Sequence, residues 1–336
     1  MFALDFPAWD PVFLDLPGPI DLRWYGLMYV VGFLVGHWIL GRLSKRGFLP
    51  LDADGVSRLL VSVVLGVLIG GRVGYALIYD HALLHPLRIL QMWNGGLSFH
   101  GGLTGVAVAV ILFARKERAP TLRVGDACAL ATPPGIFAVR FANFINGELY
   151  GRVTNADTFG AMQFPTDPAA TARMGLYGLG TRDRELAIQM AYGNVEWADV
   201  QDRVATEDVA GNPIPWDRIR EQLDWESVRE SVPNRHPSQL YEGLCEGLLL
   251  GVVLALVFFW TRRRPLGNGA YFGLFLVGYG LFRFFLENLR QPDAQFTSAD
   301  DPVGVVLFGM TMGQTLCASM MLIGALLLVV SRRTHS

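Results

Sequence analysis

Seven apolar runs, each long enough to cross a lipid bilayer, constrain the fold of this chain more than any other feature. They lie at about 22–41, 57–79, 97–114, 125–146, 239–260, 267–288 and 304–330. Hydrophobic residues make up 51% of the chain and charged residues only 17%, a composition too apolar for an ordinary soluble domain. The sequence therefore predicts an all-α integral membrane protein with about seven transmembrane helices.

Basic residues in the short connections predict the orientation of these helices. Lys and Arg gather after every second run, at Arg42, Lys45, Arg46, Arg115, Lys116, Arg118, Arg123, Arg262, Arg263, Arg264, Arg332 and Arg333. Short loops rich in Lys and Arg remain in the cytoplasm. We therefore expect the N-terminus outside and the C-terminus in the cytoplasm. The first run is expected to act as its own insertion signal, because no basic residue precedes Arg23.

A polar segment between the fourth and fifth runs divides the chain into three parts. We expect residues 1–151 to hold helices one to four, residues 152–236 to form an outer extramembrane domain, and residues 237–336 to hold helices five to seven. Within the polar segment, residues 215–228 have the spacing of an amphipathic helix. That helix either caps the membrane region or packs inside a small separate domain.

The unusual polar residues of the apolar runs all fall in the outer half of the membrane under this topology. They lie within the runs or at their outer ends, and they are Trp24, Tyr25, Arg72, His100, Arg140, Asn143, Asn146, Glu148, His236, Gln239, Tyr241, Glu242, Tyr279, Arg283, Glu287 and Arg290. Scattered structural charges would not be expected to choose one leaflet in every span, because each costs free energy in lipid. A shared polar cavity that opens outward is the economical interpretation.

Three arginines give this cavity its chemical character. Arg72, Arg140 and Arg283 exceed the carboxylates that we expect at the same depth. Guanidinium groups suit bidentate binding of phosphate, and the phosphate at hand in an outer leaflet is a phospholipid head group. Glu287 follows Arg283 by one helical turn, so that this pair is alternatively a simple ion bridge.

His100 is the candidate general base. Two glycines follow it, and apart from His37 it is the one histidine within the apolar runs. The alternative is a histidine that only packs in the core. No serine has the surroundings of a G-x-S-x-G turn, and the three cysteines lack metal or disulfide spacing. We therefore expect neither a metal nor a cofactor.

Five motifs in this chain closely resemble the prolipoprotein diacylglyceryl transferase family. In chain order they are RWYGLMY (23–29), FHGGLTG (99–105), RFANFINGELYGR (140–152), RHPSQLYE (235–242) and GYGLFRFFLENLRQPD (278–293). The resemblance implies a bacterial inner-membrane enzyme whose active site faces the periplasm. Such an enzyme moves the diacylglyceryl group of phosphatidylglycerol to the thiol of the lipobox cysteine of a prolipoprotein, forming a thioether and releasing glycerol phosphate. The chain departs from the family in one respect: its periplasmic segment is longer than the family leads us to expect. We interpret roughly residues 160–230 as an insertion.

The resemblance also implies roles for particular residues. The catalytic candidates are His100, Arg140 and Arg283. The substrate-binding candidates from the family are Tyr25, Asn143, Glu148, Gly151, Tyr279 and Glu287, to which the outer cavity adds Arg72 and Asn146. Our hypothesis is that Arg140 and Arg283 hold the phosphate, that His100 accepts the thiol proton directly or through a neighbour, and that Asn143 and Glu148 orient these groups.

The expected partners are phosphatidylglycerol, the lipobox segment of a prolipoprotein and membrane lipid. The protein itself is expected to be a monomer. Nucleic acid is not expected, because a net charge of −2 offers no bulk attraction to it. The alternative is a phospholipid or organic-anion transporter, which usually needs polar residues across the inner half of the membrane as well. An intramembrane protease would need a Ser–His or paired Asp constellation, and the sequence shows neither.

Overall fold

The computed structural model describes residues 3–7, 9–14, 22–78, 81, 85, 88–90, 96–167, 229, 232–264, 266–291 and 305–333. Most of the predicted extramembrane domain, with the helix expected at 215–228, lies outside the described residues. The chain divides into two compact units, which are described separately. Unit 1 comprises Met1–Val30, Ile136–Leu248 and Gly278–Met321, and unit 2 comprises Val31–Gly135, Leu249–Val277 and Leu322–Ser336.

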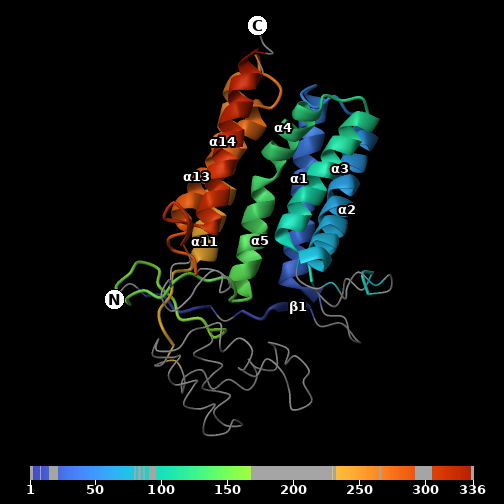
Figure 1. Cartoon of the computed structure of the whole chain (residues 1–336). Coiled ribbons are helices and arrows are strands. Elements are labelled where there is room, and N and C mark those ends of the chain that lie inside the picture. Colours follow the sequence, from blue (N-terminus) through green and yellow to red (C-terminus); the bar gives the residue numbers. More distant parts are fainter. Residues whose placement is uncertain are drawn as a thin grey trace. The chain divides into compact units, whose positions relative to one another are not determined.

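Helices occupy each of the seven apolar runs (Figure 1). In chain order they are α1 (Trp24–Lys45), α2 (Ala53–Ile78), α3 (Phe99–Lys116), α4 (Thr121–Ala131), α5 (Pro133–Ile145), α11 (Ser238–Glu242), the π-helix η4 (Gly243–Leu249), α12 (Leu250–Thr261), α13 (Ala270–Leu286) and α14 (Met312–Arg333). Two short antiparallel hairpins accompany them. The first pairs β1 (Val12–Leu14) with β2 (Leu22–Arg23), and the second pairs β3 (Val305–Leu307) with β4 (Met310–Thr311).

The prediction of a helical membrane protein is confirmed at this coarse level. Within the part of the chain that the structure describes, four helical segments are long and apolar enough to cross a membrane: Trp24–Lys45, Ala53–Ile78, Ser238–Thr261 and Met312–Arg332. A fifth is added if α4 and α5, which are bent by 42° relative to each other, form one span. The number of seven crossings and their orientation remain predictions.

Two runs differ from the sequence expectation in a way that backbone chemistry explains. The fourth run breaks at Thr132, because Pro133 and Pro134 remove two backbone N–H groups and suit the first turn of a new helix. The seventh run begins with the β3–β4 hairpin, so its helix starts at Met312 rather than near residue 304.

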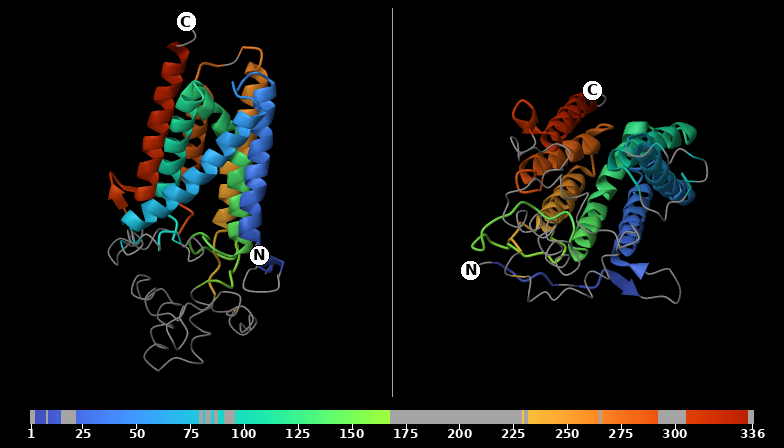
Figure 2. Two further views of the ribbon diagram at one scale, coloured as in Figure 1. Left: turned by 90° about the vertical axis from the view of Figure 1, so that its right-hand side faces the viewer. Right: turned by 60° about the horizontal axis from the view of Figure 1, so that its bottom comes forward.

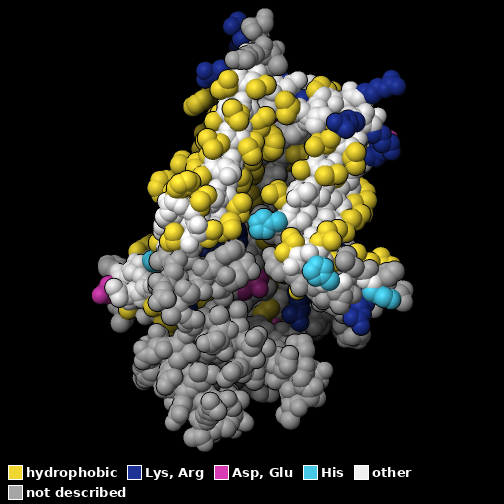
Figure 3. All heavy atoms as spheres, in the orientation of Figure 1, with side chains coloured by type: hydrophobic (Ala, Val, Ile, Leu, Met, Phe, Trp, Pro, Cys, Tyr) yellow, Lys and Arg dark blue, Asp and Glu magenta, His cyan; other side chains and the backbone are white. Residues whose placement is uncertain are grey.

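The helices expose many large hydrophobic side chains, as helices that face lipid do. Large side chains such as Leu34, Leu112 and Leu326 are each at least 60% exposed. Figure 3 shows hydrophobic side chains along the exposed faces of the helices. Exposed apolar side chains in such number mark surfaces that contact lipid or another protein.

Glycines let α2 and α3 pack backbone to backbone in unit 2 (Figure 2). A Cβ atom added to Gly70 would lie 2.4 Å from the carbonyl oxygen of Gly101, and one added to Gly105 would lie 2.1 Å from that of Gly66. Small residues four apart allow membrane helices to approach this closely. The contact fixes the first turn of α3, which carries His100.

A carboxylate joins two helices in the core of unit 2. Asp126 of α4 is fully buried, and its two oxygens accept hydrogen bonds from the backbone N–H groups of Gly269 (2.8 Å) and Phe272 (2.9 Å). Amide groups at a helix start have no partner within the helix, so Asp126 caps α13 from a distant part of the sequence. Its charge is therefore used to hold structure.

Candidate functional site

The side chains of Arg140 and Arg283 meet on one carboxylate in unit 1. Glu242 is only 1% exposed, and its Oε2 lies 2.9 Å from Nε of Arg140. Its Oε1 accepts a hydrogen bond of 3.0 Å from a terminal nitrogen of Arg283. The structure thus brings together two arginines that are far apart in the sequence, and an anionic group lies between them.

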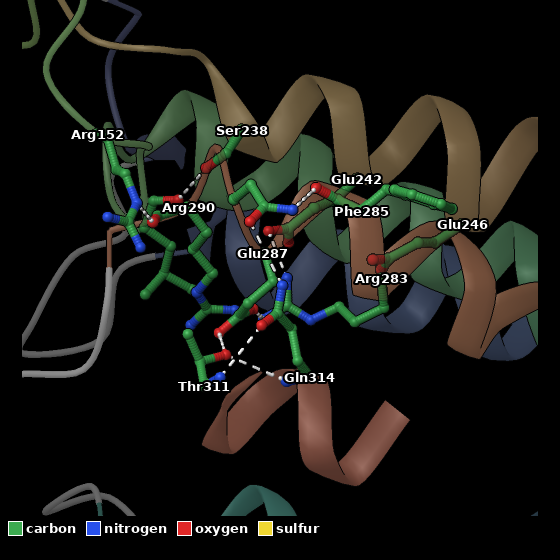
Figure 4. A network of polar contacts seen from close by, with 12 residues as sticks. Arg152, Ser238, Glu242, Glu246, Arg283, Phe285, Glu287, Arg290, Thr311 and Gln314 are labelled. Carbon is green, nitrogen blue, oxygen red and sulfur yellow. Dashed lines mark hydrogen bonds and ion pairs between the residues drawn. The ribbon is translucent and has the colours of Figure 1, made fainter. Parts of the chain in front are cut away.

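Arg283 also forms an ion pair with Glu287 on the same helix, as the alternative interpretation of the sequence expected (Figure 4). The second terminal nitrogen of Arg283 lies 2.8 Å from Oε2 of Glu287. The other oxygen of Glu287 is 3.5 Å from the hydroxyl of Thr311, and a Cβ atom on Gly313 would collide with this carboxylate. Glu287 is therefore fixed between two helices and holds one side of the guanidinium.

A further carboxylate, Glu246, lies fully buried beside Arg140. Its closest guanidinium nitrogen is 4.0 Å away, and neither carboxylate oxygen has a hydrogen-bond partner among the described residues. With Glu242 and Glu287 it makes three carboxylates around Arg140 and Arg283. Arginines therefore do not exceed carboxylates around Arg140 and Arg283 among the described residues, because Glu242 and Glu246 come from the start of the fifth run.

The end of α11 and the π-helix η4 that follows it carry Glu242 and Glu246. Gly247 lies so close to α5 that an added Cβ would be 2.7 Å from the backbone nitrogen of Phe137, and one on Gly243 would be 3.3 Å from Cβ of Arg140. Each glycine directly follows one of the two glutamates, so close backbone packing carries Glu242 and Glu246 to Arg140. The E-G-x-x-E-G pattern was the sequence signal for this arrangement. Short π-helical turns are frequent at functional sites.

Glu148 collects the polar side chains of the loop after α5. Its Oε1 accepts a hydrogen bond from the amide of Asn143 (2.8 Å) and a longer one from Asn146 (3.4 Å). The phenol of Tyr25 lies close enough to Asn143 and Glu148 to interact with both. The side-chain amide of Gln239 donates to the backbone carbonyl of Glu148 at 2.7 Å. Four residues predicted for the site therefore lie together in unit 1.

Gly151 occupies a junction of three backbone segments. Its N–H donates to the carbonyl of His236 at 2.8 Å, and it bridges Arg290 as in an antiparallel sheet. An added Cβ would lie 2.3 Å from the carbonyl oxygen of Leu289. This geometry gives Gly151 a packing role, and its contact with substrate remains a prediction. Burial lowers the pKa of the neighbouring His236.

Buried groups outside the helices hold this junction. Arg235 pairs with Asp167, donates to the carbonyl of Gly151 at 3.3 Å and lies 5.0 Å from the ring centre of Tyr150. Burial also raises the pKa of the Tyr150 phenol, which stays a neutral packing group. The segments 151–167 and 235–291 are thereby joined around Gly151.

Tyr279 lies near the charged side chains of Arg140 and Arg283 and their carboxylate partners. The residues whose charges act on its phenol are Glu246, Arg140, Arg283 and Glu242. The side chain is half-buried and comes from α13, one turn before Arg283. Tyr279 is therefore another predicted site residue that the structure places in unit 1.

Arg72 and His100 belong to unit 2. Arg72 is only 2% exposed, and its guanidinium donates to the backbone carbonyls of Arg88 (2.8 Å), Ile89 (3.1 Å) and Gly96 (3.2 Å). These bonds tie down the chain between α2 and α3. His100 is exposed in the first turn of α3, which Ser98 caps by accepting a hydrogen bond from the backbone of Gly101. Arg72 thus binds backbone carbonyls between α2 and α3. Its binding of phosphate remains a prediction.

Comparison with known proteins gives one consistent result. A family model described as prolipoprotein diacylglyceryl transferase matches residues 11–330. The phosphatidylglycerol–prolipoprotein diacylglyceryl transferase of Rhodospirillum rubrum is 40% identical over 99% of this chain and 96% of its own length. The proteins of the same name from Yersinia enterocolitica and Escherichia coli O1:K1 are 39% and 38% identical, each over 98% of this chain and 96% of their own length.

Proposed function

This chain belongs to the prolipoprotein diacylglyceryl transferase family, and from that membership we propose that it transfers the diacylglyceryl group of phosphatidylglycerol to the cysteine thiol of a prolipoprotein. The family match covers nearly the whole chain, so the resemblance predicted from five motifs is confirmed. A transporter finds no support in the family or in the names of the relatives.

The convergence of Arg140 and Arg283 on Glu242 is the observation that carries the mechanism. In the reaction a glyceryl C–O bond breaks and a C–S bond forms, while the phosphate leaves with the electrons of the C–O bond. Two guanidinium groups that face one anionic position supply the positive charge that stabilises this departing phosphate. The Glu242 carboxylate marks where an oxyanion fits.

The nucleophile comes from the substrate. The thiol of the lipobox cysteine must lose its proton to attack a saturated carbon, because the thiolate is the reactive form. We assign the acceptance of this proton to His100, which is exposed at the start of a helix that glycine packing holds in place. Asn143 and Glu148, bonded to each other, orient the groups around the head group.

The remaining assignments follow from the same proposal. Tyr25, Asn146, Tyr279 and Glu287 line or support the lipid site, and Arg72 and Gly151 contribute through the segments they hold. The protein works as a monomer in the bacterial inner membrane, with about seven crossings and its site toward the periplasm. Residues 152–236 form the periplasmic domain, between the membrane parts 1–151 and 237–336.

Replacement of Arg283 by Lys tests the phosphate assignment. The substitution keeps the charge and removes the planar fork that binds two oxygens at once. In vesicles that contain phosphatidylglycerol, with a synthetic lipobox peptide as acceptor, we expect release of glycerol phosphate to fall at least about hundredfold. The control Arg58→Lys, in an exposed pair with Glu117, is expected to stay within about twofold. Near-normal release by Arg283→Lys would remove the basis for the phosphate site.

Replacement of His100 by Gln tests the base. We expect a large loss of kcat at pH 7 that is partly recovered at higher pH, where the thiol ionises without help. The pH profile of peptide transfer measures this recovery. Unchanged turnover at pH 7 would show that another group accepts the proton, and the arginine assignment would stand.

A further inference from the structure

Glu246 is a buried acidic side chain that the mechanism above does not use. It is fully buried on η4, and both of its oxygens lack a hydrogen-bond partner among the described residues. Its nearest guanidinium nitrogen, on Arg140, is 4.0 Å away, beyond hydrogen-bond distance. An ionised carboxylate buried in this way costs free energy that only a close partner or a bound proton can offset.

The charged groups around Glu246 come from several elements of unit 1. Those that act on it are Glu242 of α11, Arg140 of α5, Arg283 of α13 and Arg290, which follows α13. The phenol of Tyr279 and the thiols of Cys245 and Cys317 also lie within its electrostatic reach. Together with Glu287, the cluster holds three guanidinium groups and three carboxyl groups.

The three carboxyl groups differ in how close their guanidinium partners lie. Glu242 has guanidinium nitrogens at 2.9 and 3.0 Å, and Glu287 has one at 2.8 Å. Such contacts favour the ionised form of a carboxylate. Glu246 has no contact of this kind among the described residues, so it is the member of the cluster that takes up a proton at the lowest cost.

When Glu246 is ionised, its charge and those of Glu242 and Glu287 lie among the guanidinium groups of the cluster, and a bound phosphodiester adds one more negative charge. The added charge is unfavourable in a buried site unless a carboxyl group becomes neutral at the same time. We propose that binding of an anionic lipid head group to Arg140 and Arg283 is coupled to uptake of a proton by Glu246. This inference rests on the proposed function, because it requires the phosphodiester to reach those two arginines.

Glu246 is then a positioning residue that acts through Arg140. Protonation removes a negative charge 4.0 Å from the terminal nitrogen of Arg140, so a phosphate oxygen that approaches this nitrogen meets less electrostatic repulsion. The proton comes from the solvent and returns to it when the charged product leaves. Affinity for the anionic lipid is therefore expected to fall as the pH rises, by at most about tenfold in Kd for each pH unit.

Calorimetry on the wild-type chain tests this coupling directly. The full-length protein in detergent is titrated with short-chain phosphatidylglycerol at pH 7.5, in two buffers that differ in ionisation enthalpy. The difference in heat gives the protons bound per lipid, and we expect a positive value of at most one. Binding with no uptake of protons would overturn the inference while leaving the phosphate site intact. If Arg283→Lys binds this lipid as tightly as the wild type, the proposed function itself fails.

A variant assigns the proton to its side chain. Glu246→Gln keeps the shape of the side chain and its neutral form, so we expect proton uptake to vanish and Kd to change less than twofold between pH 6.5 and 8.5. The control Glu117→Gln, in unit 2, should retain wild-type uptake. Wild-type proton uptake by Glu246→Gln would assign the proton elsewhere and overturn the role of Glu246. The wild-type measurement remains decisive if Glu246→Gln does not fold.

Discussion

The buried carboxylates of unit 1 and unit 2 have different partners. In unit 2, Asp126 accepts backbone N–H groups and caps a helix, and the surrounding core is apolar and packed on glycines. In unit 1, Glu242 is placed between two arginines and Glu246 has no hydrogen-bond partner among the described residues. Buried ion pairs are weak contributors to stability, since desolvation offsets most of their attraction. The comparison teaches that a buried carboxylate bonded to backbone N–H groups holds structure, whereas the proposed function gives the carboxylates beside Arg140 and Arg283 a part in binding.

The largest expected effect, on both transfer activity and stability, comes from replacing Arg283 in unit 1. Arg283→Gln should abolish transfer and destabilise the fold by about 3–5 kcal/mol, because Glu242 and Glu287 lose a buried partner. The double variant Arg283→Gln/Glu287→Gln should regain much of that stability without regaining activity. Thermal unfolding in detergent and release of glycerol phosphate measure the two effects. Recovery of activity in the double variant would contradict a phosphate-binding role for Arg283.

A single methyl group tests the packing of unit 2. Gly70→Ala places a Cβ atom 2.4 Å from the carbonyl oxygen of Gly101, so we expect a loss of about 3 kcal/mol as α2 and α3 move apart. Gly41→Ala, where nothing lies within 4 Å, is the control and should be neutral or slightly stabilising. Equal unfolding temperatures for the two variants would show that the helices are not in backbone contact.

The cap on α13 should have an intermediate effect. Asp126→Asn keeps one acceptor oxygen and removes the charge, which we expect to cost about 2 kcal/mol. Asp54→Asn, exposed in the first turn of α2, should cost less than about 0.5 kcal/mol. Chemical denaturation in mixed micelles measures both. A loss of transfer activity without loss of stability in Asp126→Asn would contradict the purely structural role.

The smallest expected effect is a pH dependence from His236. Burial lowers its pKa in the folded state, so the unfolded chain binds a proton more readily. The stability from this group is complete above the unfolded pKa of about 6.5 and is lost as the pH falls from there through the lowered pKa of the folded state. His236→Gln should flatten the unfolding temperature between pH 7 and 5, whereas exposed His81→Gln should not.

Sequence reasoning located most of this architecture but not the pairing of its charges. The seven apolar runs and the convergence of Arg140 and Arg283 were predictable, because a membrane penalises each unpaired charge. The pairing was not: the sequence placed Glu242 in the outer half of the membrane without showing that it contacts both arginines, and the position of Glu246 depends on a π-helical turn that no hydrophobic period reveals. Arg72 shows the same limit: its depth in the helix was evident, but its bonds to the backbone carbonyls of Arg88, Ile89 and Gly96 were not.

The glycine contact between α2 and α3 has a consequence for biosynthesis. It uses only residues 66–105, so the ribosome has made both surfaces before it reaches Arg140 or Arg283. Two adjacent helices that fit without side chains between them need no other part of the chain in order to pair. We therefore expect α2 and α3 to pair before the rest of the chain is made. Gly70→Ala should then lower the efficiency of membrane insertion as well as the stability of the folded enzyme.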